Sequence, residues 1–195
     1  MYFHPPNQPE ILTTDRKLSG ELAVWNALKA APFPGFLHVF YNRKPKGSNK
    51  PPDFLLIDYA RGLFNLEVKG GQVRFDKGQF RQRIKGTKGF FGKKIDPLFQ
   101  AKRALDAIIE ATGVPAADVP TAVMLAAPLM THDCYWFGEH THILTSEDLA
   151  PDRLVSKVLA LLPERPLIEQ RRTAPALKII IDALSRPGDE GFAPG

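Results

Sequence analysis

The 195-residue chain has one cysteine, Cys134, so no disulfide can form within it. No apolar run approaches the roughly 20 residues that a membrane-spanning helix needs. Residues 1–6 also lack the charged and apolar regions of a secretory signal peptide. We therefore expect a protein of the cytoplasm, a reducing compartment, with no attachment to a membrane.

Common catalytic and metal-binding signatures are missing as well. There is no Gly-x-x-x-x-Gly-Lys-Ser/Thr phosphate-binding loop and no Gly-x-Ser-x-Gly nucleophile turn, so the sequence indicates neither a P-loop nucleotidase nor a serine hydrolase. Potential zinc ligands do gather around residues 131–141, but their spacing matches no paired Cys-x-x-Cys or His-x-x-x-His site. We interpret the stretch as a polar loop; the potential ligands are His132, Cys134, Glu139, His140 and His142.

The composition is that of an ordinary globular domain. Hydrophobic residues make up 44% of the chain and charged residues 24%, and the 18 prolines and 15 glycines predict frequent turns. The length suits one domain with a real core. We expect an irregular segment over residues 1–15, a single domain over residues 16–185, and a tail or linker over residues 186–195.

Positive charge is concentrated in one segment. The chain has a net charge of +5, yet Lys69 to Arg103 contains eleven Lys or Arg against two Asp, a local charge of +9, which leaves −4 elsewhere. With its interleaved phenylalanines and glycines, the segment predicts a mobile loop that lies along a nucleic-acid backbone and stacks on bases. A merely solvated loop is the alternative. The predicted nucleic-acid contacts are Arg74, Lys77, Arg81, Arg83, Lys85, Lys88, Lys93 and Lys94.

The order of predicted elements indicates an α/β fold with a mixed sheet. Consecutive strands before a helix pair antiparallel, and a strand after the helix returns by a crossover. Ser19 is the expected cap of the first helix; Asp96, Pro97 and Gly113 are expected to cap, begin and end the second. The expected strands are residues 36–41, 53–59, 63–69, 72–75, 121–127 and 142–144, and two further helices cover about 146–162 and 174–185.

Two carboxylates and a lysine come together if the strands 53–59 and 63–69 form a hairpin centred on Arg61. Asp53 then lies opposite Lys69, and Leu55 lies opposite Glu67. Asp53 and Glu67 become diagonal neighbours on one face, with Cβ atoms roughly 7–8 Å apart. A slip of one residue in this register would destroy the arrangement.

Such a cluster has the equipment for metal-assisted hydrolysis of a phosphodiester. Asp53, Glu67 and the backbone carbonyl of Val68 offer the oxygen ligands that Mg²⁺ or Mn²⁺ takes. Lys69 would orient the attacking water or stabilise charge in the transition state. The alternative is an ordinary Glu–Lys pair on the exposed face of a strand.

The ordered motifs resemble the PD-(D/E)xK nucleases, and more closely the NERD (nuclease-related) domain, over residues 19–149. The resemblance implies a restriction-endonuclease-like core in αβββαβ order, followed here by extra helices. It also implies that Glu21 and Gln100 join Asp53, Glu67 and Lys69. From the residues alone, Glu21 is an ordinary helix-start glutamate and Gln100 a solvent-facing helix residue. The matching segments are Ser19-Gly20-Glu21, Asp53-Phe54-Leu55-Leu56-Ile57, Gly62 to Gly70, and Asp96-Pro97-Leu98-Phe99-Gln100. The basic stretch between Gly71 and Asp96 departs from the family pattern.

Three functions are compatible with these patterns. The first is a Mg²⁺- or Mn²⁺-dependent nuclease that cuts DNA, with RNA as an open alternative. The second is a nucleic-acid-binding module that keeps the fold without cutting, and the third is an interaction domain whose basic loop is only solvated. Through the resemblance, residues 186–195 also suggest a linker to a helicase-like module in the same or another chain.

Overall fold

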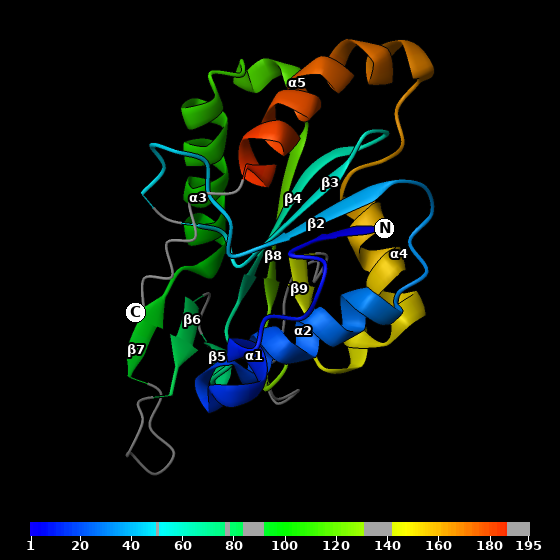
Figure 1. Ribbon diagram of the computed structural model, residues 1–195. Coiled ribbons are helices and arrows are strands. Elements are labelled where there is room, and N and C mark those ends of the chain that lie inside the picture. The colour runs from blue at the N-terminus through cyan, green and yellow to red at the C-terminus, as the bar shows by residue number, and fades with distance from the viewer. Residues whose placement is uncertain (50, 77–78, 84–91, 131–141, 187–195) are drawn as a thin grey trace.

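The computed structural model describes residues 1–49, 51–76, 79–83, 92–130 and 142–186 (Figure 1). Its centre is a six-stranded mixed sheet in the order β1-β2-β3-β4-β8-β9. The pairs β2–β3 and β3–β4 are antiparallel, and β1–β2, β4–β8 and β8–β9 are parallel. The expected α/β class with a mixed sheet is confirmed. The strands are β1 (Tyr2–His4), β2 (Leu37–Tyr41), β3 (Phe54–Asp58), β4 (Gly62–Val68), β8 (Thr121–Ala126) and β9 (Ile143–Leu144).

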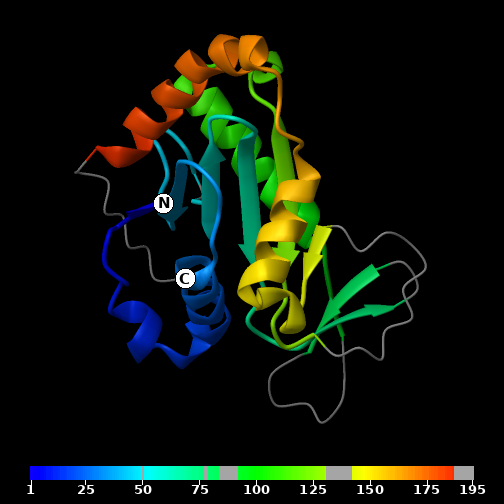
Figure 2. The same cartoon turned by 90° about the vertical axis from the view of Figure 1, so that its right-hand side faces the viewer.

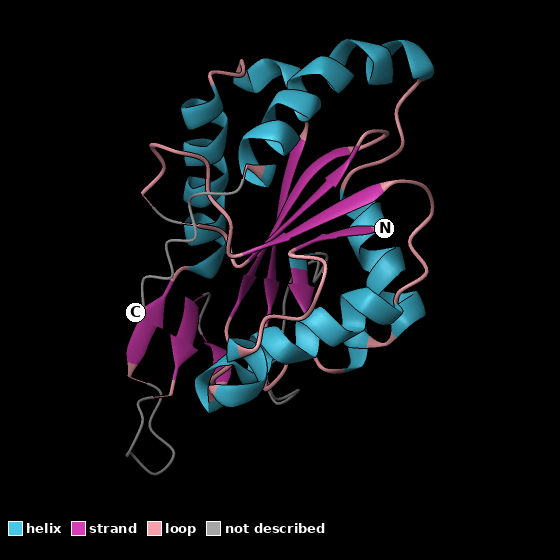
Figure 3. Ribbon diagram, in the orientation of Figure 1, coloured by secondary structure: helices cyan, strands magenta, loops and turns pink. Residues whose placement is uncertain are grey.

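Helices cover both faces of this sheet (Figure 3). Val24 of α2 and Leu154 of α4 share a core with Phe64 on one face. Leu105 of α3 and Leu177 of α5 share a second core on the other face. The helices are α1 (Ile11–Thr14), α2 (Ser19–Ala30), α3 (Pro97–Thr112), α4 (Pro151–Leu161) and α5 (Leu167–Ser185), with 3₁₀ turns η1 (Arg16–Leu18), η2 (Ala116–Asp118) and η4 (Glu147–Leu149). Within the described residues, none of the helices combines the length and the apolar character needed to cross a membrane.

Strand β4 lies between these two cores. Phe64, Leu66 and Val68 face the α2 side, and alternation turns Asn65 and Glu67 toward the α3 side. All seven residues of β4 are buried because the strand has neighbours on both edges and helices on both faces. The Asn65 side-chain amide donates to the Ala101 carbonyl at 2.7 Å and ties α3 to this strand.

Helix α3 begins and ends as predicted. The Asp96 side chain accepts from the backbone N–H of Phe99, Pro97 is the first helical residue, and Gly113 ends the helix with a left-handed φ of 69°. These local signals are sufficient because each one satisfies backbone groups that a helix end leaves unpaired.

Three predicted boundaries are wrong. Ser19 is the first residue of α2 and not its cap, because the preceding turn η1 runs directly into the helix and is itself capped by Asp15. The first fifteen residues are not irregular throughout, since they contain β1 and α1. At the other end, the helix expected from residue 174 begins at Leu167, with Pro175 inside it.

The basic segment forms a second sheet rather than a loop. Strands β5 (Val73–Asp76), β6 (Gln79–Gln82) and β7 (Lys93–Ile95) pair antiparallel in sequence order. We call this sheet the β5–β7 arm; it projects beyond the end of the central sheet (Figure 2). Val73 and Ile95 are buried against residues of β8 and β9, including Leu125 and Ile143. Strand β5 was expected at residues 72–75, whereas β6 and β7 were not, because the apolar alternation in each spans only three or four residues.

A candidate active site at the end of strands β3 and β4

The β3–β4 register differs from the prediction by two residues. Leu55 pairs with Asn65 rather than with Glu67, and Asp58 pairs with Gly62 across the turn. Side chains alternate with a period of two, so this shift leaves every residue on its predicted face. Continuing the register by one residue beyond β3 places Asp53 directly across from Glu67, a closer relation than the predicted diagonal.

Hydrogen bonds hold the three predicted residues at this end of β3 and β4. The Asp53 carboxylate accepts from the backbone N–H of Val68 at 2.6 Å. The Lys69 ammonium donates to the Glu67 carboxylate at 2.6 Å, and the Lys69 backbone N–H donates to the Ala126 carbonyl at 2.9 Å. Only 2% of the Glu67 side chain and 18% of the Lys69 side chain are exposed. The pair is therefore not an ordinary Glu–Lys pair on the exposed face of a strand, which was the alternative.

Glu21 reaches the same place from the opposite face of the sheet. Its helix α2 starts in close contact with the end of β4: a Cβ on Gly20 would lie 2.5 Å from the Gly70 Cα. Burial raises the pKa of Glu21, while Lys69 lowers it and Glu67 raises it, so all three charges interact. Among the described residues, the buried Oε2 atom of Glu21 has no hydrogen-bond partner.

Burial and neighbouring charge also perturb Asp53. Burial, followed by repulsion from Glu67, raises its pKa to about 7. The Val68 N–H and the Lys69 charge oppose this rise. Three carboxylates thus share one lysine in a poorly solvated place, and this excess negative charge is what a cation would relieve.

Tyr41 is a further member of the site that the sequence patterns did not identify. It ends β2, pairs with Phe54 next to Asp53, and is buried. Burial, and then the charges of Glu21 and Asp53, raise the pKa of its hydroxyl, which therefore stays protonated at neutral pH. The usable signal was its position as the last residue of the strand that precedes Asp53.

Gln100 is half-buried in the first turn of α3, and its backbone N–H donates to the Asp96 carbonyl at 3.0 Å. The residue lines a cavity of about 610 Å³ between residues 47–49 and α3, together with Arg103. Among the described residues, no hydrogen bond or ion pair connects Gln100 with Asp53, Glu67 or Lys69. Its membership of the site stays a prediction from the resemblance.

The donor set suits a hard divalent cation. Asp53, Glu67 and the Val68 carbonyl are oxygen donors, and the orphaned Glu21 oxygen adds another acceptor nearby. Over the residues that the structure describes, no three His, Cys, Asp or Glu side chains converge closely enough to form a metal-binding group. The fit therefore depends on chemistry and excess charge: two carboxylates with one carbonyl, and waters to complete the shell.

The rival zinc ligands cannot be compared directly. His132, Cys134, Glu139 and His140 lie outside the described residues. His142 is exposed, and its Nδ1 lies 2.9 Å from the Val123 carbonyl.

Four of the eight predicted nucleic-acid contacts lie on strands of the β5–β7 arm. Arg74, Lys93 and Lys94 are exposed and Arg81 is half-buried, whereas Lys77, Lys85 and Lys88 lie outside the described residues. Arg83 is exposed, and its guanidinium donates to the Gln72 side-chain carbonyl at 2.7 Å.

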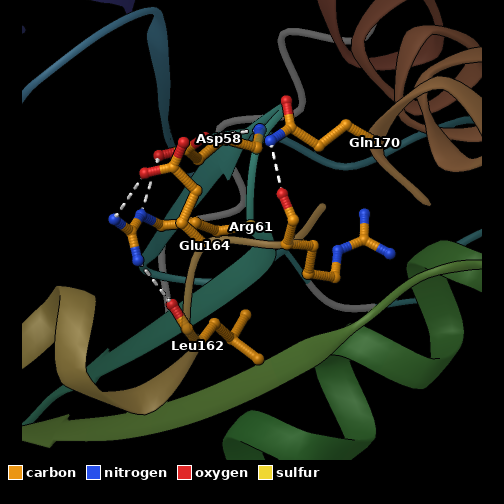
Figure 4. Close-up of polar contacts among 7 residues, drawn as sticks. Asp58, Arg61, Leu162, Glu164 and Gln170 are labelled. Atoms are coloured by element: carbon orange, nitrogen blue, oxygen red, sulfur yellow. Dashed lines mark hydrogen bonds and ion pairs between the residues drawn. The ribbon is translucent and has the colours of Figure 1, made fainter. Parts of the chain in front are cut away.

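A second charged cluster lies at the other end of the same two strands (Figure 4). Arg61 contacts Asp58 at 3.7 Å and Glu164 at 3.5 Å and donates to the Leu162 carbonyl at 2.9 Å. Burial raises the pKa of Asp58, while the Ala60 N–H and Arg61 lower it. These contacts fasten the connection between α4 and α5 to the β3–β4 turn, and we assign the cluster a structural role.

Comparison with known proteins adds no relative. No protein-family model matches the chain, and no curated protein or solved structure is significantly similar to it. The resemblance to the NERD domain and the restriction-endonuclease-like form of the core remain predictions from the ordered motifs.

Proposed function

We propose that the chain is a nuclease of the PD-(D/E)xK type that depends on Mg²⁺ or Mn²⁺ and hydrolyses phosphodiester bonds in DNA. The observation that carries the proposal is that Asp53, Glu67, Lys69 and Glu21 lie together at one end of β3 and β4. The cluster holds more buried negative charge than one lysine balances. Isolated surface pairs do not produce such an excess, whereas sites that bind a cation do.

Each side chain has a defined part in this chemistry. Asp53, Glu67 and the Val68 carbonyl would hold the cation, which when bound supplies positive charge beside the phosphate and a more acidic water. The Lys69 ammonium, fixed by Glu67, stabilises negative charge that develops on the phosphate or orients the attacking water. Glu21 offers an acceptor for that water, and Tyr41 keeps its proton beside the charges of Glu21 and Asp53.

The test is a cleavage assay on supercoiled plasmid with Mg²⁺ or Mn²⁺. Wild-type protein is compared with Glu67→Ala and Lys69→Ala, and with Glu164→Ala as the matched control from the structural cluster. We expect the wild type and the control to cut, and both site variants to lose cleavage. Equal cleavage by all four proteins would refute the mechanism.

The second candidate is a nucleic-acid-binding module that does not cut. The observation in its favour is that the Lys69 ammonium already donates to the Glu67 carboxylate at 2.6 Å, so the lysine is engaged without a cation or a substrate. This candidate predicts salt-dependent binding that is the same with Mg²⁺ and with EDTA, and no cleavage by the wild type.

A further inference from the structure

Three cations lie in a row across the β5–β7 arm. Arg74 pairs with Arg81 on the neighbouring strand, and Arg81 pairs with Lys94 on the third strand. Directly opposed residues of a sheet project from the same face, so these three residues share one face. Because neighbouring strands are about 4.8 Å apart, the row is roughly 10 Å wide at the backbone.

The opposite face of the arm carries its apolar side chains. Phe75 and Phe80 pair with each other across the strands, with ring centroids 4.9 Å apart. They pack with Val73 and Ile95 against β8 and β9. The expectation that these two phenylalanines stack on bases is therefore wrong, because their rings pack on each other and against β8 and β9. Phe90 and Phe91, also expected to stack, lie outside the described residues.

The three residues of the row carry charge of the same sign. Like charges directly opposite one another on a sheet are destabilising. In the described part of the chain, no carboxylate forms an ion pair with Arg74, Arg81 or Lys94. Asp76 pairs with Gln79 two positions along the strands from Arg74 and Arg81. A surface of this kind is complementary to a polyanion.

The arm is also anchored beside the candidate active site. Only Gly70, Gly71 and Gln72 separate Lys69 from β5. Arg83, at the end of β6, donates its backbone N–H to the Gln72 carbonyl at 3.0 Å as well as its guanidinium to the Gln72 side chain. A polyanion bound on the row is thus held at the end of the sheet where Asp53 and Glu67 lie.

We propose that the face carrying Arg74, Arg81 and Lys94 docks the backbone phosphates of a double-stranded nucleic acid. This inference deepens the proposed function and rests on it for the identity of the cleaved substrate. Proteins that hold single strands combine basic grooves with aromatic stacking platforms, and the described aromatics of the arm face the other way. The row's width is comparable with the roughly 12 Å width of the major groove of duplex DNA.

The experiment measures binding without cleavage, by fluorescence anisotropy in EDTA with a labelled DNA duplex of about 20 base pairs. A single strand of the same length is the competitor probe. The test variant is the triple R74Q/R81Q/K94Q. The matched control is K178Q, because Lys178 is an exposed lysine of α5, outside the arm, that forms an ion pair with Asp182.

We expect the wild type to bind duplex at least about tenfold more tightly than single strand. The triple variant should lose at least about tenfold in duplex affinity near 0.1 M salt, and its salt slope should fall by about 2.7, since each lost phosphate contact contributes about 0.9. K178Q should stay within about twofold of the wild type. Equal losses for the triple variant and K178Q, an unchanged salt slope, or tighter binding of single strand would each overturn the proposal.

Failure of this inference is distinguishable from failure of the nuclease proposal. If the wild type binds duplex through the row but no metal supports cleavage, the nuclease proposal fails and the docking surface stands. If Glu67→Ala abolishes cleavage while the triple variant binds as the wild type does, the nuclease stands and the docking surface fails. The circular dichroism spectrum of the triple variant checks that the arm still folds.

Discussion

The β3–β4 hairpin carries a charged cluster at each end, and the two clusters differ in balance. At the turn, Arg61 is engaged by Asp58, by Glu164 and by a backbone carbonyl, and 65% of the Glu164 side chain is exposed to water. At the open end, Glu67 is almost fully buried and Lys69 serves a site where Asp53 and Glu21 add further negative charge.

The comparison separates a cluster that stabilises the fold from one that weakens it. Arg61 contacts Asp58, Glu164 and the Leu162 carbonyl, so its cluster fastens one segment to another. Asp53 and Glu21 have raised pKa values because the folded chain disfavours their charged forms. Residues that weaken the apo fold in this way are typical of functional sites.

The largest expected difference between the two ends is in catalysis. Glu67→Gln and Lys69→Gln should each reduce the cleavage rate by about 100-fold or more, because each removes charge that acts on the reacting phosphate. Glu164→Gln, an equally small change at the turn, should alter the rate by less than about threefold. Initial rates of plasmid nicking measure both, and similar rates for all three variants would abolish the distinction.

The next effect concerns stability and has opposite signs at the two ends. Asp53→Asn should raise the free energy of unfolding at pH 8 by on the order of 2–3 kcal/mol, because the variant no longer buries this charge. Arg61→Ala should lower it by about 1–3 kcal/mol, because the Leu162 carbonyl loses a donor and the buried Asp58 loses its neighbouring positive charge. Urea denaturation at constant ionic strength measures both values.

The pH dependence of stability checks the expected increase in the free energy of unfolding for Asp53→Asn. A carboxyl group whose pKa is raised from 3.8 to about 7 by folding binds its proton more tightly in the folded state. The free energy of unfolding therefore falls as the pH rises between these values and levels off above pH 7. The advantage of Asp53→Asn over the wild type should grow over this range; a constant advantage from pH 4.5 to pH 8 would contradict the assignment.

A smaller effect is expected where α2 meets β4. Gly20→Ala should cost about 1–2 kcal/mol of stability, because the added methyl group would meet the Gly70 backbone and push α2 away. The displacement should also reduce cleavage by moving Glu21. Ser19→Ala, at the exposed preceding position, is the control and should leave both properties unchanged; thermal unfolding and nicking rates distinguish the variants.

The smallest predicted change is stabilisation by the cation itself. At a Mg²⁺ concentration ten times its dissociation constant, the free energy of unfolding should rise by about 1.4 kcal/mol. Glu164→Gln should keep this response and Asp53→Asn should lose it. Melting curves with Mg²⁺ and with EDTA measure the response without any assay of activity. An equal response in both variants would show that the cation binds outside the candidate site.

Much of the fold could be predicted because its signals are local. The Asp96 cap, the first-turn Pro97 and the terminal Gly113 act within a few residues of the helix ends that they define. The buried run of β3 was readable for the same reason, since its residues are apolar on both faces. Of the site, the common face of Asp53 and Glu67 was predictable from the period of a strand.

The predictions that the structure corrects depend instead on contacts between distant segments. The β3–β4 register depends on where the turn closes: Asp58 pairs with Gly62, so the hairpin is centred on Ala60 rather than on Arg61. Of the β5–β7 arm, only the strand over residues 72–75 was expected; β6 and β7 were not, because they are short and the arm is stabilised by packing against β8 and β9. Neither the turn closure nor that packing partner is visible in the composition of the segment.

Residue types, spacing and charge therefore specify this protein's α/β class, its hairpin and a carboxylate–lysine set, because propensity and alternation operate over a few neighbouring residues. The partners of that set come from long-range packing. Gly20 admits the close approach of α2 that brings Glu21 beside Lys69, and the β2–β3 pairing brings Tyr41 beside Asp53. Pairing across three short strands likewise aligns Arg74, Arg81 and Lys94 and turns Phe75 and Phe80 away, because the free energy of contacts between distant segments decides which residues meet.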